Sequence, residues 1–484
     1  MMAPSSGRRM KAVLHGAWFG SLVCLILIIG CQDRQHVGSQ IPEQFTQYCI
    51  SCHGQDLKGG VAQSLIDGSW QFGARKSDIF RSIKFGHPSF GMPSWGAVFN
   101  DEEIMGLADY LMTNEVKSDE EDKVIPQNVE TLDYMLSTEV IAEGLENPWG
   151  IVFLAEDHFL VTERPGRLRV FENGKLNPTP VEGIPEVVGG GQGGLLDVAI
   201  DPDYKQTGWV YLVLSHGIKS ETDTIPLAMT AVVRGRIIDN KWSESEVIYE
   251  APHDSYLNTR IHYGGRIAFD KKQFLYLSIG DRSLSERAQD LSLPNGKIHR
   301  LHKDGSIPKS NPFYGAKDKL WSIYSLGHRN PQGLTIHPET DKVWVAEHGP
   351  LGGDEVNQIN AGLNYGWPKI SYGINYNGEL ISEFESMDGL EQPIWYWKPS
   401  IAVSGINFYT GDQFPKWKNQ LLVSALRFEE VQLLNVKDNK VIFQQTLLKN
   451  YGRVRQVSAG PNGAIYVVFD MPGRIVRLRR SDGV

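Results

Sequence analysis

Two cysteines and a histidine near the start of the chain have a spacing that defines their chemistry. Cys49, Cys52 and His53 form a Cys-x-x-Cys-His motif. Two thiols at this spacing can add to the vinyl groups of a haem, and the histidine that follows can reach the iron from one side. Taken alone, the motif could also be a thiol redox pair or a zinc site.

The second axial ligand of such a haem should come from a turn further along the chain. Met92 stands in a Gly-Met-Pro sequence and is the predicted ligand, because a Met/His pair raises the haem potential and suits electron transfer. His87 is the competing ligand, and Met92 could instead fill a core. Apolar residues at helical spacing over 101–111 predict a closing helix.

Residues 38–115 resemble a class I cytochrome c. The resemblance implies a small all-α domain over 31–115 that carries one covalent haem c, with His53 and Met92 on the iron. At this size the haem itself must supply much of the core.

The chain begins with a sequence typical of export. Residues 1–30 read as a signal peptide, with a basic start and an apolar run that ends in Leu-Ile-Ile-Gly before Cys31. This end resembles a bacterial lipobox, which would make Cys31 the lipidated first residue of a periplasmic, membrane-tethered lipoprotein of a Gram-negative bacterium. An uncleaved membrane anchor is the alternative. With only four cysteines in the chain, no pair is left for a structural disulfide.

Composition sets further limits. The chain has 484 residues, too many for one typical domain, and 22% charged residues, a globular value. Its net charge of −9 argues against a nucleic-acid partner. The charged stretch 116–129 lacks apolar periodicity and is predicted to be a solvated linker.

From 130 to 484 the pattern changes to short β-rich runs bounded by Gly, Pro, Asn and Asp. Examples are 158–163, 209–215, 274–281, 342–349, 420–426 and 464–470. Their repeat over roughly 50–70 residues fits four-stranded propeller blades, and the domain is long enough for about six. A pair of β-sandwiches is the alternative, but it would not explain why the strand ends are rich in His, Arg, Asp and Gly. The predicted fold is therefore an all-α cytochrome c domain followed by an all-β six-bladed propeller.

Motifs spread over this second domain occur in the order of a known family. They are LENPWGIVF (145–153), VTERPGRL (161–168), GGQGGLL (190–196), HYGGR (262–266), GHRNPQG (327–333), EHGP (347–350) and NYGWP (364–368). Together they resemble the soluble sugar dehydrogenases that depend on pyrroloquinoline quinone (PQQ), the glucose/sorbosone and aldose sugar dehydrogenase family. The resemblance implies a six-bladed propeller with PQQ and calcium over its axis.

The resemblance also implies catalytic roles. His262 matches the general base, and a neutral imidazole suits that task near neutral pH. Asp281 resembles the carboxylate that orients this histidine, although a turn-capping role is the alternative. Arg329 and Asn330 resemble the pair beside the quinone, where Arg329 would stabilise developing negative charge. Some glucose-oxidising relatives have Asp before the catalytic histidine, whereas this chain has Ile261, which leaves the substrate open.

Other residues match positions that hold the cofactors. Arg427, Arg453 and Arg455 resemble the cations around PQQ, although each could form a surface salt bridge instead, and Gln192 resembles a polar residue that faces sugar and quinone. Calcium takes oxygen ligands. The carbonyls of Gly349 and Pro350 resemble the pair that holds the active-site calcium, and Glu355 and Tyr365 resemble part of a second calcium site.

These features predict a PQQ-dependent enzyme that oxidises the C1 hydroxyl of an aldose to a lactone. Its electrons would pass to the fused haem and then to a respiratory acceptor. The alternatives are a non-sugar alcohol or aldehyde as substrate, a non-catalytic binding propeller, or a haem that serves sensing. Trp395, Tyr396, Trp397 and Tyr409 could stack on a sugar, although core positions are expected for at least half of them.

Overall fold

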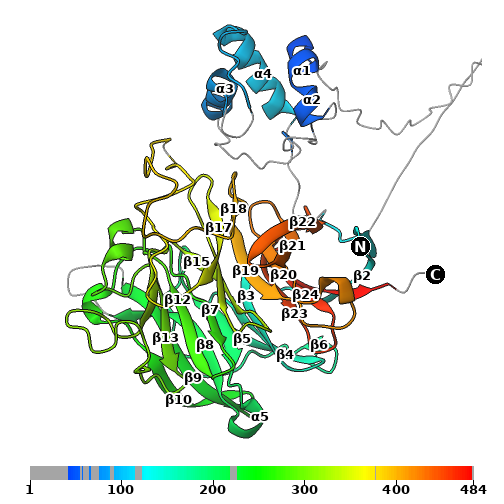
Figure 1. Cartoon of the computed structure of the whole chain (residues 1–484). Coiled ribbons are helices and arrows are strands. Elements are labelled where there is room, and N and C mark those ends of the chain that lie inside the picture. Colours follow the sequence, from blue (N-terminus) through cyan, green and yellow to red (C-terminus); the bar gives the residue numbers. More distant parts are fainter. Residues whose placement is uncertain are drawn as a thin grey trace, which may run out of the picture. The chain divides into compact units, whose positions relative to one another are not determined.

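The computed structural model describes residues 42–54, 57, 65–66, 76–87, 92–114, 123–218, 226–376 and 378–481 (Figure 1). The predicted signal peptide and lipidation site at Cys31 lie outside these ranges. None of the described helices is both long and apolar enough to cross a membrane.

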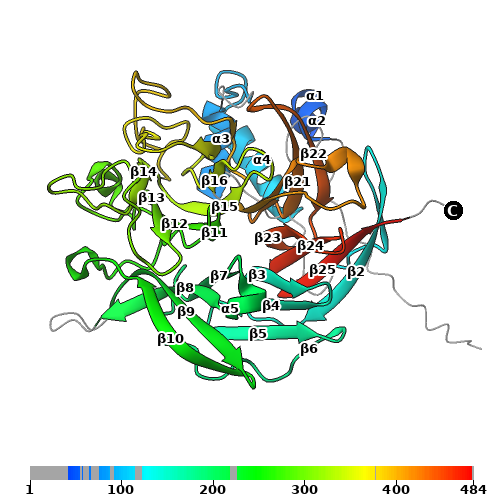
Figure 2. The same ribbon diagram turned by 60° about the horizontal axis from the view of Figure 1, so that its bottom comes forward.

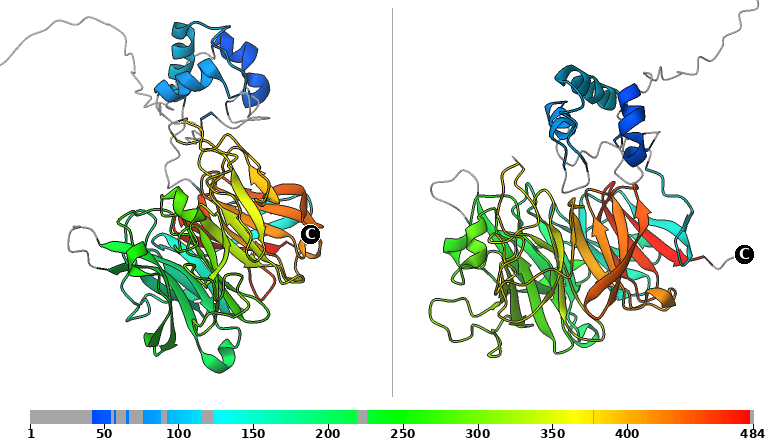
Figure 3. Two further views of the ribbon diagram at one scale, coloured as in Figure 1. Left: turned by 60° about the vertical axis from the view of Figure 1, so that its left-hand side comes forward. Right: turned by 45° about the horizontal axis from the view of Figure 1, so that its top comes forward.

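The N-terminal part is helical, as predicted. Its helices are α1 (Glu43–Tyr48), α2 (Ile50–His53), α3 (Lys76–Phe85) and α4 (Asp101–Thr113). The closing helix α4 begins with a capping box, in which the Asn100 side chain accepts from the backbone of Glu103 and the Glu103 side chain accepts from the backbone of Asn100. Figure 3 shows the helices of this part gathered together in both views.

One hydrophobic cluster joins these helices. Ile104, Leu107 and Leu111 place the buried face of α4 against Phe45 of α1 and Ile79 of α3. The apolar spacing seen in the sequence is therefore the spacing of this core.

The second part is a β-propeller of six sheets, which confirms the predicted fold class (Figure 2). The first three sheets are β3 (Pro148–Ala155), β4 (His158–Glu163), β5 (Arg167–Glu172) and β6 (Lys175–Leu176); β7 (Leu195–Ile200), β8 (Val210–Ile218), β9 (Leu227–Ile238) and β10 (Lys241–Tyr249); and β11 (Ile267–Phe269), β12 (Phe274–Ile279), β13 (Lys297–His302) and β14 (Ile323–Leu326). A short helix, α5 (Tyr204–Thr207), lies between β7 and β8.

The remaining sheets follow in chain order except at the closure. They are β15 (Pro331–Ile336), β16 (Val343–Glu347), β17 (Asp354–Ile359) and β18 (Trp395–Trp397); β19 (Val403–Phe408), β20 (Leu421–Ala425), β21 (Glu430–Lys437) and β22 (Lys440–Lys449); and β23 (Arg453–Ala459), β24 (Ile465–Met471) and β25 (Arg474–Arg480), to which β2 (Met135–Glu143) and β1 (Asn128–Glu130) are added.

Pairing between the two ends of the domain closes the ring. β2 pairs antiparallel with β25, with Leu136 opposite Arg480 and Glu143 opposite Arg474. The first strands of the sheets form a continuous inner circle, since β3 contacts β7, β7 contacts β11, β11 contacts β15, β15 contacts β19, β19 contacts β23, and β23 contacts β3. The ring therefore leaves no inner strand without a neighbour.

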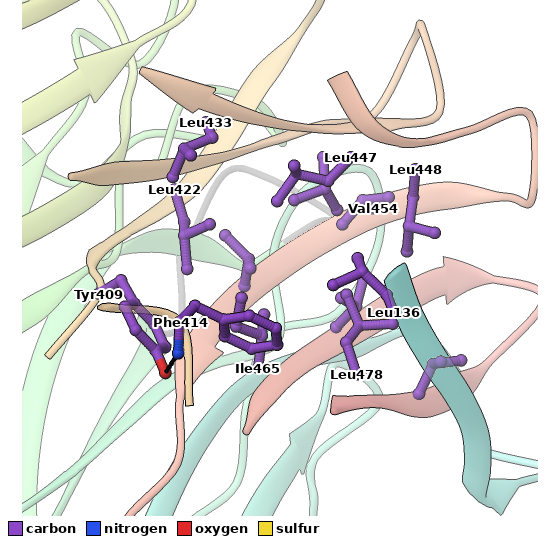
Figure 4. Close-up of a cluster of buried hydrophobic side chains, with 14 of the residues drawn as sticks. Leu136, Tyr409, Phe414, Leu422, Leu433, Leu447, Leu448, Val454, Ile465 and Leu478 are labelled. Atoms are coloured by element: carbon purple, nitrogen blue, oxygen red, sulfur yellow. Dashed lines mark hydrogen bonds between the residues drawn. The ribbon is translucent and has the colours of Figure 1, made fainter. Parts of the chain in front are cut away.

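Large buried side chains fill the space between the last two sheets. Leu422 and Leu433 of one sheet pack against Val454, Ile465 and Leu478 of the closing sheet (Figure 4). The linker prediction is wrong for its last residues, because Ile125 joins this cluster and β1 adds to the closing sheet. Burial of Ile125, with Val129 packed against the same cluster, outweighs the charged composition around them.

A buried arginine ties the inner circle together. The guanidinium of Arg266, from the start of the third sheet, lies 3.8 Å from the ring centroid of Trp149 in the first. It donates to Oδ1 of Asp197 (3.3 Å), to the carbonyl of Gln332 (2.6 Å) and to the carbonyl of Arg455 (3.1 Å). Burial lowers the pKa of Arg266 to about 10, so the side chain keeps its charge at neutral pH. One cation thus links its own sheet to four others beneath the end that carries the site.

Candidate active site

The predicted site residues lie at one end of the propeller. In four sheets, the start of the first strand faces the end of the second: Pro148 is opposite Glu163, Pro331 opposite Glu347, Val403 opposite Ala425, and Arg453 opposite Met471. Antiparallel pairing therefore brings the segments before the first strands and the turns after the second strands together. These segments hold the polar residues that the sequence singled out.

His262 and Asp281 form a hydrogen-bonded pair at this end. Nδ1 of His262 lies 2.7 Å from Oδ1 of Asp281, and both residues are buried. A carboxylate oxygen only accepts, so Nδ1 carries the proton and Nε2 of the neutral ring is available as a base. Asp281 also accepts from the backbone N–H of Ser283 (2.7 Å), so the turn-capping role and the orienting role occur in one side chain.

The backbone of His262 is held in the left-handed region, at φ +55°. This conformation is costly for a residue with a side chain and is often found at functional sites. Oε1 of Gln192 accepts from the N–H of His262 (2.8 Å), and the N–H of Gln192 donates to the carbonyl of Arg260 (2.7 Å). Gln192, predicted to face the ligand, thus also fixes the segment that carries the base.

The surroundings keep His262 neutral. Burial lowers its pKa, the hydrogen bond from Nδ1 to Asp281 raises it, and the charge of Arg329 lowers it again. The net direction is below the ordinary value, which matches a general base that must be unprotonated.

Arg329 reaches the loop that follows β16. Its guanidinium donates to the carbonyls of His348 (3.2 Å) and Gly349 (3.0 Å), while its backbone N–H donates to Oε2 of Glu347 (2.7 Å). The carboxamide oxygen of Asn330 accepts from the N–H of Gly264 (3.1 Å) and so connects this segment to the one that carries His262. Arg329 and Asn330, the predicted pair, are therefore hydrogen-bonded to the loop after β16 and to the segment that carries His262.

Arg453 and Arg455 share a counter-ion but differ in environment. Arg455 is buried and donates to Oδ2 of Asp470 (3.1 Å) and to Oε1 of Gln332 (2.7 Å). Arg453 is 43% exposed, and its Nε lies 3.9 Å from the same oxygen of Asp470. Burial raises the pKa of Asp470, but the charges of Arg455 and Arg453 outweigh it and hold that pKa below its ordinary value. Arg427 lies in the turn after β20, where its N–H donates to the carbonyl of Ile401 (3.0 Å).

Sequence reasoning missed His348, although it lies in the quoted Glu-His-Gly-Pro motif. Its Nε2 is buried and has no hydrogen-bond partner among the described residues. Burial lowers its pKa well below the ordinary value, and the charges of Arg329, Arg455, His262 and Arg453 lower it further. Arg329, Arg453 and Arg455 therefore all lie within electrostatic range of one imidazole.

This donor set fits a polyanionic planar group such as PQQ. Arg329, Arg453 and Arg455 lie in this region, and Asp470 is paired with the last two of them. Nε2 of His348 and Nε of Arg455 are buried without hydrogen-bond partners among the described residues. Several carboxylates would satisfy both the charge and the unused donors. Arg329, Arg453 and Arg455 are therefore the residues suited to hold the group.

The calcium predictions are supported unequally. The carbonyl of Gly349 points toward the site, where Arg329 donates to it, and a Cβ at this glycine would lie 2.3 Å from the backbone of Gly353. Pro350, the other predicted carbonyl ligand, is buried beside it. Within the described ranges, no three His, Cys, Asp or Glu side chains are grouped to hold a metal ion.

Glu355, on β17, and Tyr365, just after it, are the residues of the second predicted calcium site, and each has a hydrogen-bond partner of its own. Glu355 accepts from Nδ2 of Asn357 (3.1 Å), whereas the hydroxyl of Tyr365 donates to the carbonyl of Gln358 (2.7 Å). Burial, followed by the charge of Glu347, raises the pKa of Glu355 to about 8.

The aromatic candidates divide as the sequence suggested. Trp397 and Tyr409 are buried in hydrophobic clusters. Tyr396 is 42% exposed and stacks on Tyr372 at a centroid distance of 4.0 Å. Ile261, next to the base, is also exposed.

In the helical part, the haem-attachment residues border the core. His53 ends α2, its N–H donates to the carbonyl of Cys49 (3.0 Å), and both cysteines carry free thiols. Cys49 and Met92 pack against the same hydrophobic cluster. The backbones of His87 and Met92 exchange hydrogen bonds (2.8 and 3.2 Å), so the two competing ligands lie opposite each other in an antiparallel bridge. A thiol and a thioether beside one apolar core, with the exposed Cys52 three residues after Cys49, fit a covalent haem.

Comparison with known proteins identifies both parts of the chain. The family model named "Glucose / Sorbosone dehydrogenase" matches residues 145–477. The model named "Cytochrome C oxidase, cbb3-type, subunit III" matches residues 38–111. The second match identifies the N-terminal part as a cytochrome c domain. It describes the kind of cytochrome c more narrowly than the class I resemblance of the sequence.

Similar proteins cover most of the propeller. The aldose sugar dehydrogenase YliI of Escherichia coli (strain K12) is 40% identical over 339 residues, which are 69% of this chain and 90% of that protein. Quinoprotein glucose dehydrogenase B of Acinetobacter calcoaceticus is 28% identical over 428 residues, covering 71% of this chain and 87% of that protein.

Solved structures of similar sequence have the same fold as the propeller. The soluble aldose sugar dehydrogenase of Escherichia coli in its apo form superposes with a TM-score of 0.67 at 37% identity, covering 72% of this chain and 100% of that one. The PQQ-bound aldose sugar dehydrogenase of Streptomyces coelicolor gives a TM-score of 0.57 at 26% identity, covering 72% and 98%.

Proposed function

The chain belongs to the glucose/sorbosone dehydrogenase family, and we propose that it is a PQQ-dependent aldose sugar dehydrogenase with its own haem relay. The observation that carries the proposal is the His262–Asp281 pair, with Arg329, Arg453 and Arg455 all within electrostatic range of His348. A base and a cluster of cations are what oxidation of a sugar hydroxyl at an anionic quinone requires.

In this reaction Nε2 of His262 takes the proton from the C1 hydroxyl of the sugar. Asp281 holds the imidazole in the required tautomer and stabilises the positive charge that forms on it. When bound, PQQ supplies the two-electron acceptor for the hydride that leaves C1.

The remaining cationic residues bind the cofactor and stabilise the charge that develops on it. Arg453 and Arg455 would hold carboxylates of the cofactor, with Arg427 as a further cation at the rim. Arg329 and Asn330 would lie beside the quinone, where the guanidinium stabilises negative charge that develops there. The carbonyls of Gly349 and Pro350 would hold calcium, and Gln192 would keep the base segment in place.

The N-terminal domain provides the onward route for electrons. Cys49 and Cys52 would attach one haem c, with His53 and Met92 as axial ligands, and the fusion raises the local concentration of electron acceptor. A respiratory acceptor would then receive the electrons. We place the protein in the periplasm, tethered through lipidated Cys31, with a cytochrome c domain at 31–115 and a propeller that takes in Ile125 and β1.

The experiment is a substrate panel on the full chain loaded with PQQ and calcium. Lactone formation is measured for several aldoses, with a dye as electron acceptor, in the wild type and in His262→Ala. Turnover that falls at least about a thousandfold in the variant supports the proposal. Turnover only with a non-sugar alcohol or an aldehyde would change the substrate class, and failure to bind PQQ would favour a binding propeller.

A further inference from the structure

Trp367 contacts both sides of the proposed proton-transfer machinery. Its indole Nε1–H donates to Oδ2 of Asp281 (2.8 Å). The guanidinium of Arg329 lies over the same ring, 5.4 Å from its centroid. One side chain from the long segment between β17 and β18 thus touches the carboxylate that orients the base and the cation beside it.

The loop that carries Trp367 is fixed from two directions. The N–H of Trp367 donates to the carbonyl of Gly327 (3.0 Å), and its carbonyl accepts from Nε2 of Gln289 (2.7 Å). The side chains of Gln289 and Asn364 exchange two further hydrogen bonds (3.1 and 2.8 Å). Gly327 permits this close approach, because it has φ +81° and a Cβ there would lie 2.2 Å from Oδ1 of Asn364.

Every oxygen of the Asp281 carboxylate is therefore occupied. Oδ1 accepts from His262 and from the N–H of Ser283, and Oδ2 accepts from Trp367. A carboxylate held at both ends cannot rotate away from the imidazole without losing a charge-assisted hydrogen bond.

We propose that Trp367 is a positioning residue for sugar oxidation, which fixes Asp281 so that Nδ1 of His262 stays bonded and Nε2 stays free to take the proton. The inference rests on the proposed function, because it assumes that His262 is the base. It adds a third member, from another sheet, to the pair that the sequence identified.

The indole N–H also sets how much negative charge faces the imidazole. The charged and titratable groups near His262 are Asp281, Arg329, Arg282 and His348. Removing the indole donor leaves the Asp281 charge less compensated, so that protonation of His262 becomes easier and its pKa rises.

Trp367→Phe is the informative variant, because it removes the N–H and keeps an aromatic ring beneath Arg329. Trp321→Phe is the matched control, since it removes an indole hydrogen bond to the carbonyl of Ala316 (2.9 Å) at an exposed position. The pKa of His262 is measured by NMR on the full chain labelled with ¹³C-histidine, with the signal assigned through His262→Ala. The kcat and KM of the PQQ-loaded proteins are measured in parallel.

We expect a higher His262 pKa and a kcat about tenfold lower in Trp367→Phe, with KM changed less and Trp321→Phe like wild type. Trp367→His, which keeps a ring N–H, should recover part of the loss. In an Asp281→Asn background, Trp367→Phe should change kcat less than about twofold. An unchanged His262 pKa, or the full kcat loss in that background, would overturn the inference. The NMR result needs no turnover, so it is independent of whether the proposed function holds.

Discussion

Replacing Arg455 with methionine should destabilise the propeller, whereas replacing Arg453 should weaken PQQ binding and leave the fold intact. The two residues stand two apart at the start of β23, and both reach Asp470. Both are suited to hold the cofactor, but only Arg455 is also tied into the buried part of the fold.

Arg455 is needed in the folded chain itself. Its side chain is 6% exposed, and its loss would leave Oδ2 of Asp470 and the amide oxygen of Gln332 buried without the hydrogen bonds that Arg455 donates. Removing one partner of a buried ion pair costs about 3–5 kcal/mol of unfolding free energy.

Arg453 contributes little to the folded chain. Its ion pair with Asp470 is long, at 3.9 Å, and the side chain is 43% exposed, so its loss should cost at most about 1 kcal/mol. A charge-assisted hydrogen bond to a ligand carboxylate is worth about 1.5–3 kcal/mol, so Arg453→Met should weaken PQQ binding about 10- to 100-fold.

Denaturant unfolding of the PQQ-free protein and equilibrium dialysis with PQQ measure the two effects separately. Arg479→Met is the control, because Arg479 has a similar exposure of 44% and a similarly long ion pair (3.7 Å) at the other end of the blade. Equal unfolding free energies for the Arg453 and Arg455 variants, or unchanged PQQ affinity in Arg453→Met, would refute this division of roles.

Three further predictions follow from the same structure. Because the pKa of His262 is lowered and the base must be neutral, the acid limb of the kcat/KM profile should lie below pH 6.5, and a limb above 6.5 would contradict this. Asp281→Asn should move the acid limb to still lower pH and reduce kcat about 10- to 100-fold. Leu478→Ala, at a fully buried position of the closing sheet, should lower the unfolding free energy by about 3–5 kcal/mol in denaturant titrations, whereas a loss under about 1 kcal/mol would contradict the packing described (Figure 4). Cys52→Ala should leave the haem attached through one thioether only, which the α-band position and mass spectrometry report; an unmodified mass for the wild type would contradict covalent attachment.

Much of the fold was accessible from local patterns. Alternating apolar runs marked the second strand of each sheet, and the period of the runs indicated the number of sheets. Closure of the ring was not accessible, because it depends on pairing Leu136 with Arg480 across the whole domain. The sequence did not predict that Ile125 belongs to the hydrophobic core. The composition of a segment averages over its residues, so a charged segment can still contain one apolar side chain that is buried.

The site was accessible where a motif carries its own chemistry. His262 and Asp281 were paired on resemblance, and the structure joins them by a hydrogen bond. Arg453 and Arg455 have unequal environments at a place where β23 shows register shifts around Val454, which a regular two-residue alternation does not contain. Trp367 lies in a quoted motif, yet its partner comes from another loop, so only the fold reveals the contact.

The most direct test of the account is stopped-flow absorbance of the haem in the full chain, loaded with PQQ and calcium and mixed with an aldose that it oxidises. The account predicts that the sugar reduces the haem within the time of one turnover without any added mediator, and that His262→Ala abolishes this reduction while PQQ stays bound. Lactone formation with an artificial acceptor while the haem stays oxidised would contradict electron transfer from the propeller to the cytochrome domain.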